Sequence, residues 1–314
     1  MRLPIILALS LLSLLPVAAQ ETTTVTDDAG RSVTIPAQPA RIATLDDLRL
    51  TVPLIELGVQ PIASHGRVSG NTPYIRASRI LTGVDFDNSA IAFLGNDLDI
   101  EALAKAEPDL IITLASRAEQ LEQLEKIAPT LVFDPARTDY LGIYDRLAEI
   151  TGAQDRLAYL KARYEAQLAQ LRHLIDTASI TVSVFDAVNG TITVQKTYGS
   201  LGIVLQDAGF QFPEIYDTIA EGTEIKVSAE YLPQLDADIV FDTFRADRNE
   251  TPADADARMR EVLDSYCQAL WACTNDQYFV LPREDVYAIS YAGLSTAISM
   301  VTALMSAQQI ELRP

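Results

Sequence analysis

The chain has 314 residues, of which 48% are hydrophobic and 21% charged, and its formal net charge at pH 7 is −19. This composition is too apolar for a disordered chain, and the length is sufficient for two globular domains. A protein with this negative net charge would repel the phosphates of nucleic acids. We therefore expect no nucleic-acid partner.

The first nineteen residues have the pattern of a secretory signal peptide. One positive charge, Arg2, precedes an apolar run, and small residues lead to a cleavage site near Ala19. An uncleaved anchor is the alternative, but Pro4 and Pro16 leave a run shorter than the roughly 20 residues that a spanning helix needs. We therefore expect residues 1–19 to be removed during export.

The first half of the remaining chain alternates between strand and helix patterns. We expect a hairpin over 22–39, strands over 41–45, 59–63, 110–113 and 130–133, and helices over 51–57 and 118–127. Alternation of this kind predicts a parallel sheet covered by helices.

Two segments about a hundred and thirty residues apart follow one pattern. Each has a glutamate at the start of a short helix, Glu101 or Glu230, and then an aspartate, Asp109 or Asp238, directly before an apolar run typical of a buried strand. The repetition predicts two related α/β halves. A cleft between two such halves is a common place for a ligand.

A continuous helical pattern over 154–177 joins the halves and would be about 35 Å long. One unbroken helix resists wide hinge closure, so we expect little movement on binding. The second half restarts with strands over 180–185 and 191–194 around an Asn189-Gly190 turn, a helix over 200–208, a helical segment over 252–266, a strand over 278–281 and a helix over 293–309. The expected domains are 20–150, the connecting helix 151–178, and 179–314.

The cysteines and histidines limit the possible chemistry. Cys267 and Cys273 could form a disulfide in an oxidising compartment, or could be two buried thiols.

Two histidines, His65 and His173, are too few for a site in which several histidines bind a metal ion, so we expect no such site. Trp271 lies in an apolar run and is expected to be a packing residue.

Five motifs in order resemble one family. They are Asp28-Ala-Gly30-Arg-Ser-Val-Thr-Ile-Pro, Pro39-Ala-Arg-Ile-Ala, Leu57-Gly-Val-Gln-Pro-Ile, Glu107-Pro-Asp-Leu-Ile-Ile and Ile127-Ala-Pro-Thr-Leu-Val-Phe. They resemble the periplasmic substrate-binding proteins of bacterial ABC importers for ferric siderophores, haem and cobalamin, and the resemblance covers about residues 25–310. It implies two Rossmann-like α/β lobes with parallel sheets joined by one long rigid helix. It also implies a monomer that carries its ligand in the interlobe cleft to a permease at the inner membrane.

The resemblance gives Glu101 and Glu230 a role in docking. In the family, one acidic residue of each lobe at this motif pairs with arginines of the permease. The alternative is local, because a carboxylate near a helix start interacts favourably with the helix dipole by about 0.3 to 1 kcal/mol.

Ligand contacts are expected on loops at the carboxyl ends of the strands, where open parallel sheets bind ligands. Arginine can pair with an anionic iron chelate, and tyrosine provides flat contact. The alternative for each candidate is a solvated or half-packed surface residue. Arg117 and Arg245 are favoured because each follows a strand of the repeated pattern. The candidate ligand-binding residues are His65, Arg67, Arg117, Tyr198, Arg245, Tyr287 and Tyr291, with Asp46, Asp47, Arg49 and Arg248 on the same loops.

These observations favour a ferric siderophore as ligand, with haem or cobalamin as alternatives. We find no phosphate-binding loop, nucleophile elbow or zinc-protease motif, so we do not expect an enzyme or a cofactor. A secreted enzyme that uses the cleft, or a receptor that senses the ligand without an importer, remain the competing classes.

Overall fold

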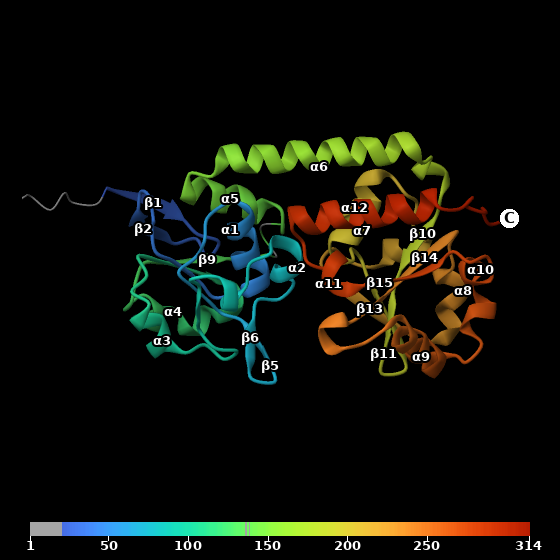
Figure 1. Cartoon of the computed structure of the whole chain (residues 1–314), viewed down its shortest axis with the longest axis horizontal. Coiled ribbons are helices and arrows are strands. Elements are labelled where there is room, and N and C mark those ends of the chain that lie inside the picture. Colours follow the sequence, from blue (N-terminus) through green and yellow to red (C-terminus); the bar gives the residue numbers. More distant parts are fainter. Residues whose placement is uncertain (1–20, 136, 138) are drawn as a thin grey trace, which may run out of the picture.

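The computed structural model describes residues 21–314 apart from 136 and 138. The proposed signal peptide, residues 1–19, lies outside the described residues. Figure 1 shows two lobes side by side, with the long helix α6 lying across both of them. None of the helices in the described ranges is both long and apolar enough to cross a membrane.

The first lobe is built on a five-stranded parallel sheet in the order β7-β4-β3-β8-β9. All residues of β8 and β9 are buried, as expected for strands that are covered on both faces. Two antiparallel hairpins, β1–β2 and β5–β6, flank the sheet. The elements are β1 (Thr22–Thr26), β2 (Ser32–Pro36), β3 (Ile42–Thr44), α1 (Val52–Glu56), β4 (Ala63–Ser64), β5 (Arg67–Ser69), β6 (Thr72–Tyr74), α2 (Ser78–Thr82), β7 (Ala92–Phe93), α3 (Ile100–Lys105), β8 (Leu110–Leu114), α4 (Leu121–Leu124), β9 (Thr130–Phe133) and α5 (Gly142–Thr151).

The second lobe contains a parallel sheet in the order β10-β14-β15 and an antiparallel sheet in the order β11-β12-β13. The strand expected over 180–185 is the shorter β10, and its expected partner across the Asn189-Gly190 turn is wrong, because the chain enters the antiparallel sheet at Asp186 and a separate strand, β11, pairs with β12. The elements are β10 (Val182–Val184), β11 (Asp186–Val188), β12 (Thr191–Gln195), α7 (Gly199–Ala208), β13 (Glu224–Val227), α8 (Leu232–Leu235), β14 (Ile239–Phe244), α9 (Pro252–Val262), α10 (Trp271–Thr274), β15 (Tyr278–Pro282), α11 (Arg283–Val286) and α12 (Tyr291–Ser306).

The hairpin between β11 and β12 turns at Asn189-Gly190, as the sequence predicts. Both residues have positive φ, 52° and 72°, which is the backbone that a tight two-residue hairpin requires. Asparagine and glycine adopt this conformation more readily than other residues.

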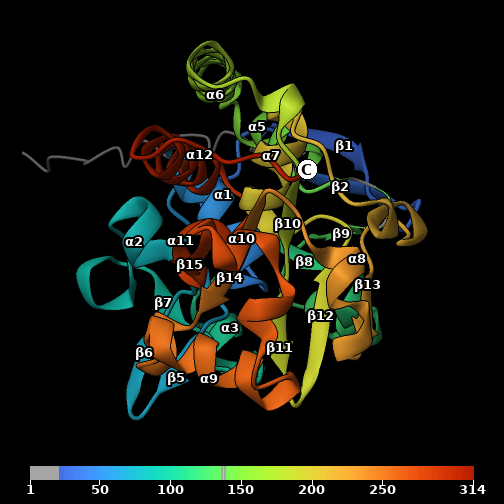
Figure 2. The ribbon, with the colours of Figure 1, turned by 90° about the vertical axis from the view of Figure 1, so that its right-hand side faces the viewer.

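The connecting helix α6 (Gln154–Leu174) has 21 residues and is about 32 Å long. Its buried residues recur every three or four positions and form one stripe: Leu157, Leu160, Tyr164, Leu168 and Leu171. The helix lies against α5, α7 and α12, as Figures 1 and 2 show. The helix therefore packs on elements of both lobes and ends three residues earlier than predicted.

The repeated sequence pattern has one structural role in both lobes. The Asp109 carboxylate accepts the backbone N–H groups of Ala40 and Arg41 at 2.9 Å, just before β3. The Asp238 carboxylate accepts the backbone N–H of Thr181 at 2.6 Å, just before β10. In each lobe the aspartate fixes the start of the strand beside its own.

Two helices differ from their predicted bounds. The helix expected over 118–127 is the short α4 after an irregular turn at Ala115–Gln120, which contains non-helical backbone at Arg117. The last helix begins at Tyr291 because the Ser290 side chain caps it, accepting the backbone N–H of Gly293 at 3.0 Å.

Cys267 and Cys273 are joined by a disulfide, with their Cα atoms 5.0 Å apart. Extended backbone at Leu270 separates the turn Tyr266–Ala269 from α10, and this break brings the two side chains together. Trp271 lies in the loop that the disulfide closes and is half-buried, and its indole N–H donates to the carbonyl of Glu311 at 3.5 Å.

Candidate ligand-binding cleft

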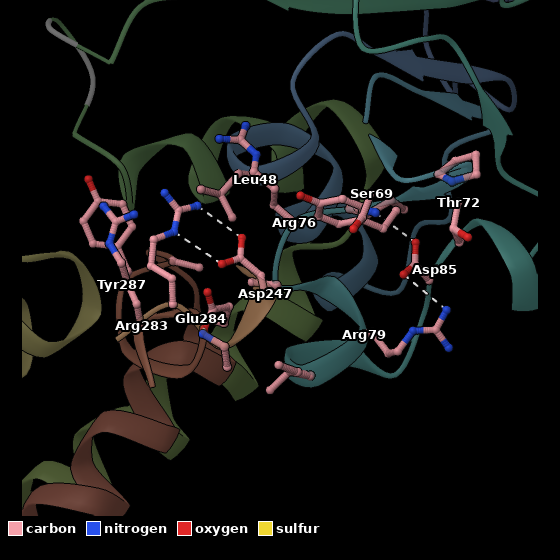
Figure 3. A pocket seen from close by; sticks show the side chains of 18 residues that line it. Leu48, Ser69, Thr72, Arg76, Arg79, Asp85, Asp247, Arg283, Glu284 and Tyr287 are labelled. Atoms are coloured by element: carbon pink, nitrogen blue, oxygen red, sulfur yellow. Dashed lines mark hydrogen bonds and ion pairs between the residues drawn. The ribbon is translucent and has the colours of Figure 1, made fainter. Parts of the chain in front are cut away.

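A cavity of about 470 Å³ lies between the lobes at the carboxyl ends of β14 and β15. Its walls come from the β5–β6 hairpin and α2 in the first lobe, and from the loop after β14 and helix α11 in the second (Figure 3). The lining residues are Leu48, Ser69, Thr72, Pro73, Tyr74, Ile75, Arg76, Ala77, Arg79, Ile80, Asp85, Arg245, Ala246, Asp247, Arg283, Glu284, Tyr287 and Ala288.

A second cavity of about 520 Å³ adjoins the first and shares Leu48 and Tyr287 with it. The other lining residues of the second cavity are Arg49, Tyr140, Gln195, Thr197, Gly199, Gly222, Thr223, Glu224 and Ile289. The interlobe cleft therefore has two chambers, which meet at Leu48 and Tyr287.

Arg283 is held in the wall of the first chamber by two tyrosines. Its guanidinium carbon lies 3.8 Å from the centre of the Tyr287 ring. Its Nε donates to the Tyr198 hydroxyl at 3.3 Å, and that hydroxyl shares a 2.6 Å hydrogen bond with Thr243. Burial raises the pKa of Tyr198 well above its ordinary value, so this hydroxyl stays protonated.

The other arginines of this chamber are paired with carboxylates. Arg76 binds Asp47 through Nε at 3.0 Å, Arg79 lies 3.3 Å from Asp85, and Arg245 lies 3.1 Å from Asp247. Arg283 is different, because no carboxylate of the described residues forms a salt bridge with it, although the largely buried Asp186 carboxyl acts on it electrostatically from a longer distance. The chamber therefore has one guanidinium whose charge is not neutralised by an ion pair.

Asp47 holds Arg76 from behind the cavity wall. The carboxylate is fully buried. Burial alone would raise its pKa, but the neighbouring His65 ring and the Arg76 guanidinium hold the pKa well below its usual range. His65 is 3% exposed, and its Nε2 lies 2.8 Å from the carbonyl of Asn96. These residues therefore position Arg76 rather than reach into the cavity.

Glu284 and Asp247 form a hydrogen-bonded acid pair in the chamber. Burial, together with the hydrogen bond to Asp247, raises the pKa of Glu284 to about 7. Burial opposes ionisation of Asp247, but Glu284 and Arg245 outweigh it and lower the pKa of that carboxyl. The charge in the cavity therefore changes near neutral pH.

Among the candidate residues from the sequence, Arg245 and Tyr287 line the first chamber and Arg49 lines the second. Arg67 instead donates to the Asn96 side chain at 3.2 Å, and Arg117 donates to the carbonyl of Leu45 at 3.1 Å. Neither of these two lines either chamber.

The expectation of direct ligand contact is corrected for three candidates. Tyr198, Tyr291 and His65 are only 2%, 4% and 3% exposed. Tyr198 lies directly behind Tyr287, with the ring centres 5.3 Å apart, and supports it. Tyr291 packs edge-on against Tyr144 at 5.0 Å in the core between the lobes.

Most of the charged residues that line the cavity were not among the candidates from the sequence. Arg283 follows β15 directly, so the same rule that selected Arg245 could have found it. Tyr74, Arg76 and Arg79 come from a hairpin and a short helix for which no pattern was assigned. Nothing in their local sequence distinguishes them from surface residues.

Glu101 and Glu230 are both exposed. Glu101 lies in the first turn of α3, and Glu230 lies in the single turn Ala229–Tyr231 before α8. Both positions allow the favourable helix-end interaction, and their role in docking stays a prediction.

Over the described residues, no three His, Cys, Asp or Glu side chains are grouped so that they could hold a metal ion.

A family model described as periplasmic binding protein matches residues 92–262, more than half of the chain. The chain belongs to this family. Its members are binding proteins. The probable siderophore-binding lipoprotein YfiY of Bacillus subtilis is 28% identical over 242 residues, covering 74% of this chain and 72% of that protein. The ferric enterobactin-binding periplasmic protein FepB of Escherichia coli is 26% identical over 203 residues, covering 61% and 62%.

Solved structures confirm the two-lobed fold with its long connecting helix. The FhuD protein from S. pseudintermedius matches with a TM-score of 0.73 at 20% identity, covering 92% of this chain and 99% of that one. Staphylococcus aureus SirA complexed with staphyloferrin B matches with a TM-score of 0.71 at 20% identity, with the same coverage. At this identity, the likeness concerns the fold alone.

Proposed function

We propose that this protein is the extracytoplasmic binding component of an ABC importer and carries an anionic ferric siderophore in its interlobe cleft. The family supports a binding role rather than catalysis. Relatives named for siderophore, ferric hydroxamate and ferric enterobactin binding support the ligand class.

The observation that carries this proposal is the unpaired guanidinium of Arg283. It is fixed on the Tyr287 ring inside the cavity, 3.8 Å from the ring centre. A guanidinium held in this way favours the oxygen atoms of an anionic ligand, because forming the contact costs little side-chain freedom. Ferric siderophores present negatively charged oxygen atoms around the iron.

The rest of the chamber suits a bulky, partly apolar ligand. Leu48, Pro73, Ile75 and Ile80 line it beside Tyr74 and the charged residues. Its volume of about 470 Å³ lies within the usual range for small-molecule sites. The combination of one guanidinium without a salt bridge and apolar walls fits a metal chelate better than a small polar metabolite.

The histidines favour a siderophore over a haem bound through histidine. His65 is buried, with its Nε2 beside the carbonyl of Asn96, and His173 lies in the last turn of α6. Neither residue lines a chamber of the cleft. A haem bound here would need another axial ligand.

Delivery to a membrane permease is the second part of the proposal. Glu101 and Glu230 are exposed. Each lies in the repeated sequence pattern of its lobe, before the strand β8 or β14. We assign Glu101 and Glu230 to docking on the permease. The protein that docks is a monomer, with one lobe at residues 20–150, the other at residues 179–314, and the connecting helix at 151–178. Export with cleavage near Ala19 would place the protein in the periplasm.

Calorimetric titration of the purified chain from residue 20 tests the ligand. The panel comprises ferric hydroxamate, catecholate and carboxylate siderophores, haem and cobalamin. We expect saturable one-to-one binding of at least one ferric siderophore, which mass spectrometry should recover unchanged. Binding of haem or cobalamin alone, or chemical conversion of the ligand, would contradict the proposal.

A further inference from the structure

The segment of the second lobe that carries Tyr287 ends at a contact with the first lobe. Tyr287 and Ala288 line the first chamber, and Ile289 lines the second together with Tyr287. Two residues later α12 begins, and the backbone N–H of Tyr291 donates to the Glu56 carboxylate of the first lobe at 2.9 Å. The second-lobe wall of the cleft is therefore fastened to the first lobe within a few residues of both chambers.

Between the chambers and this contact, the backbone is closely packed. A Cβ atom at Gly199 would lie 2.2 Å from the carbonyl oxygen of Tyr287, and a Cβ atom at Gly293 would lie 2.4 Å from the carbonyl oxygen of Ala288. The Ala288 carbonyl also accepts a hydrogen bond from the Ser200 hydroxyl at 2.6 Å. Because this part of the wall lies directly against the first turn of α12, a shift of that turn would move the wall with it.

Glu56 belongs to the same helical segment as Leu48, which is the other residue that both chambers share. A helical turn over Asp47–Thr51 continues directly into α1, and α1 ends at Glu56. Glu56 is fixed within the first lobe, because its carboxylate accepts the Tyr144 hydroxyl at 2.6 Å and its backbone carbonyl accepts the Arg156 Nε–H at 3.0 Å. The carboxylate therefore connects the first-lobe wall of the cleft to the second-lobe wall.

We propose that Glu56 is a positioning residue for ligand binding, which sets the width of the cleft between Leu48 and Tyr287, where the two chambers meet. This inference rests on the proposed function. It adds that affinity depends on a carboxylate that lines neither chamber. A cleft held at a fixed width binds its ligand more tightly, because less freedom of the walls is lost on binding. Arg283 is held by the same link, since its guanidinium lies on the Tyr287 ring.

The affinity test compares two variants of Glu56 with a control. Glu56→Ala removes the link, whereas Glu56→Gln keeps one acceptor oxygen. The control, Leu124→Ala, truncates a fully buried side chain of α4 that lines neither chamber, so it destabilises the protein away from the cleft. Ferric enterobactin, ferrichrome and ferric staphyloferrin B, one chelate of each class, are titrated by calorimetry at a temperature well below the unfolding of every variant.

Hydrogen exchange of the ligand-free proteins gives a second readout. The backbone N–H of Tyr287 donates to the carbonyl of Arg283 at 2.9 Å and makes no contact with Glu56. Its exchange rate therefore reports on the mobility of the cleft wall, and not on the direct loss of the Glu56 acceptor.

We expect E56A to weaken the best-bound chelate about tenfold and to speed exchange of the Tyr287 amide more than L124A does. E56Q should lose no more than about threefold in affinity, and L124A should bind like the wild type. An equal loss of affinity in E56A and L124A, or equal exchange of the Tyr287 amide in both, would overturn the positioning role and leave the proposed function standing. If no chelate binds the wild type, the proposed function fails, and the exchange of the Tyr287 amide still decides whether Glu56 holds the wall.

Discussion

Glu56 in the first lobe accepts a hydrogen bond from the backbone N–H of Tyr291 in the second lobe, at 2.9 Å. The same carboxylate accepts the N–H of Ala292 at 2.9 Å and the hydroxyl of Tyr144 at 2.6 Å, and it is only 7% exposed. A carboxylate here caps the start of α12 and interacts favourably with its dipole. The lobes are therefore connected by this buried cap as well as by α6.

Replacing Glu56 should destabilise the protein strongly. In Glu56→Ala, the buried N–H of Tyr291, the partly buried N–H of Ala292 and the Tyr144 hydroxyl lose their acceptor, so we expect a loss of about 3 kcal/mol in the free energy of unfolding. Urea denaturation of E56A measures it, and Glu149→Ala, an exposed glutamate on α5, is the matched control. If the free energy of unfolding fell by the same small amount in E56A and in E149A, the cap would not stabilise the fold.

Tyr198 should act on affinity through Arg283. In Tyr198→Phe, Arg283 loses its hydrogen bond but keeps its contact with the Tyr287 ring. We expect the affinity for a ferric siderophore to fall about three- to tenfold and the stability to fall by about 1 kcal/mol. Calorimetry with the exposed Tyr159→Phe as control measures both quantities. An unchanged affinity in Y198F would mean that Arg283 does not need this support.

Glu284 should make binding of an anionic ligand depend on pH. As the pH rises through about 7, Glu284 ionises and adds a negative charge to the cavity. Affinity should therefore decrease between about pH 6 and about pH 8, and Glu284→Gln should flatten this dependence. Titrations at several pH values in wild type, E284Q and the exposed control Glu261→Gln check this. An affinity that rises with pH, or an equal slope in E284Q, would contradict the expectation.

The same shift affects stability. The pKa of Glu284 in the folded protein is higher than its ordinary value of 4.5. Its contribution to stability is thus fully present below that ordinary value and is lost as the pH rises through about 7. Thermal unfolding of E284Q should show a weaker pH dependence than that of the wild type over this interval.

Reversing both docking charges should uncouple transport from binding. We expect the double variant Glu101→Lys, Glu230→Lys to abolish siderophore uptake through the cognate permease, because surface charge pairs mainly set orientation and association rate. Ligand affinity should stay within a factor of about two, since neither residue lines a chamber.

Uptake of radioactive iron into reconstituted vesicles measures the effect. Glu149→Lys with Glu165→Lys, two exposed positions on α5 and α6, is the control of equal charge. Normal iron uptake with the double variant, or a loss of its ligand affinity, would contradict a docking role for Glu101 and Glu230.

The periodic parts of the fold could be predicted from the sequence. β9 was predicted to the residue, and the expected α6 differs from the observed helix by three residues, because continuous apolar runs and regular helical stripes are local signals. The separate hairpin strand β11, directly after the strand expected over 180–185, could not be predicted, since it depends on which sheet each residue pairs with.

The site was predicted less well than the fold. Arg245 and Tyr287 line the cavity, because strand ends locate a cleft in an open parallel sheet, and their contact with a ligand stays a prediction. Burial of Tyr198 was not foreseeable, because it depends on the packing of Thr243, Arg283 and Tyr287 around it within the second lobe. Burial of Tyr291 depends on the packing of the two lobes against each other, since it contacts Tyr144 of the first lobe. The wall formed by Tyr74, Arg76 and Arg79 likewise depends on how the β5–β6 hairpin and α2 lie against the second lobe.

Calorimetric titration of Arg283→Gln with the ferric siderophore that binds the wild type best tests the central claim most directly. The unpaired guanidinium predicts that R283Q binds roughly 10- to 100-fold more weakly and unfolds at nearly the same temperature, whereas the exposed control Arg248→Gln binds like the wild type. Equal affinity in R283Q and R248Q would contradict the account.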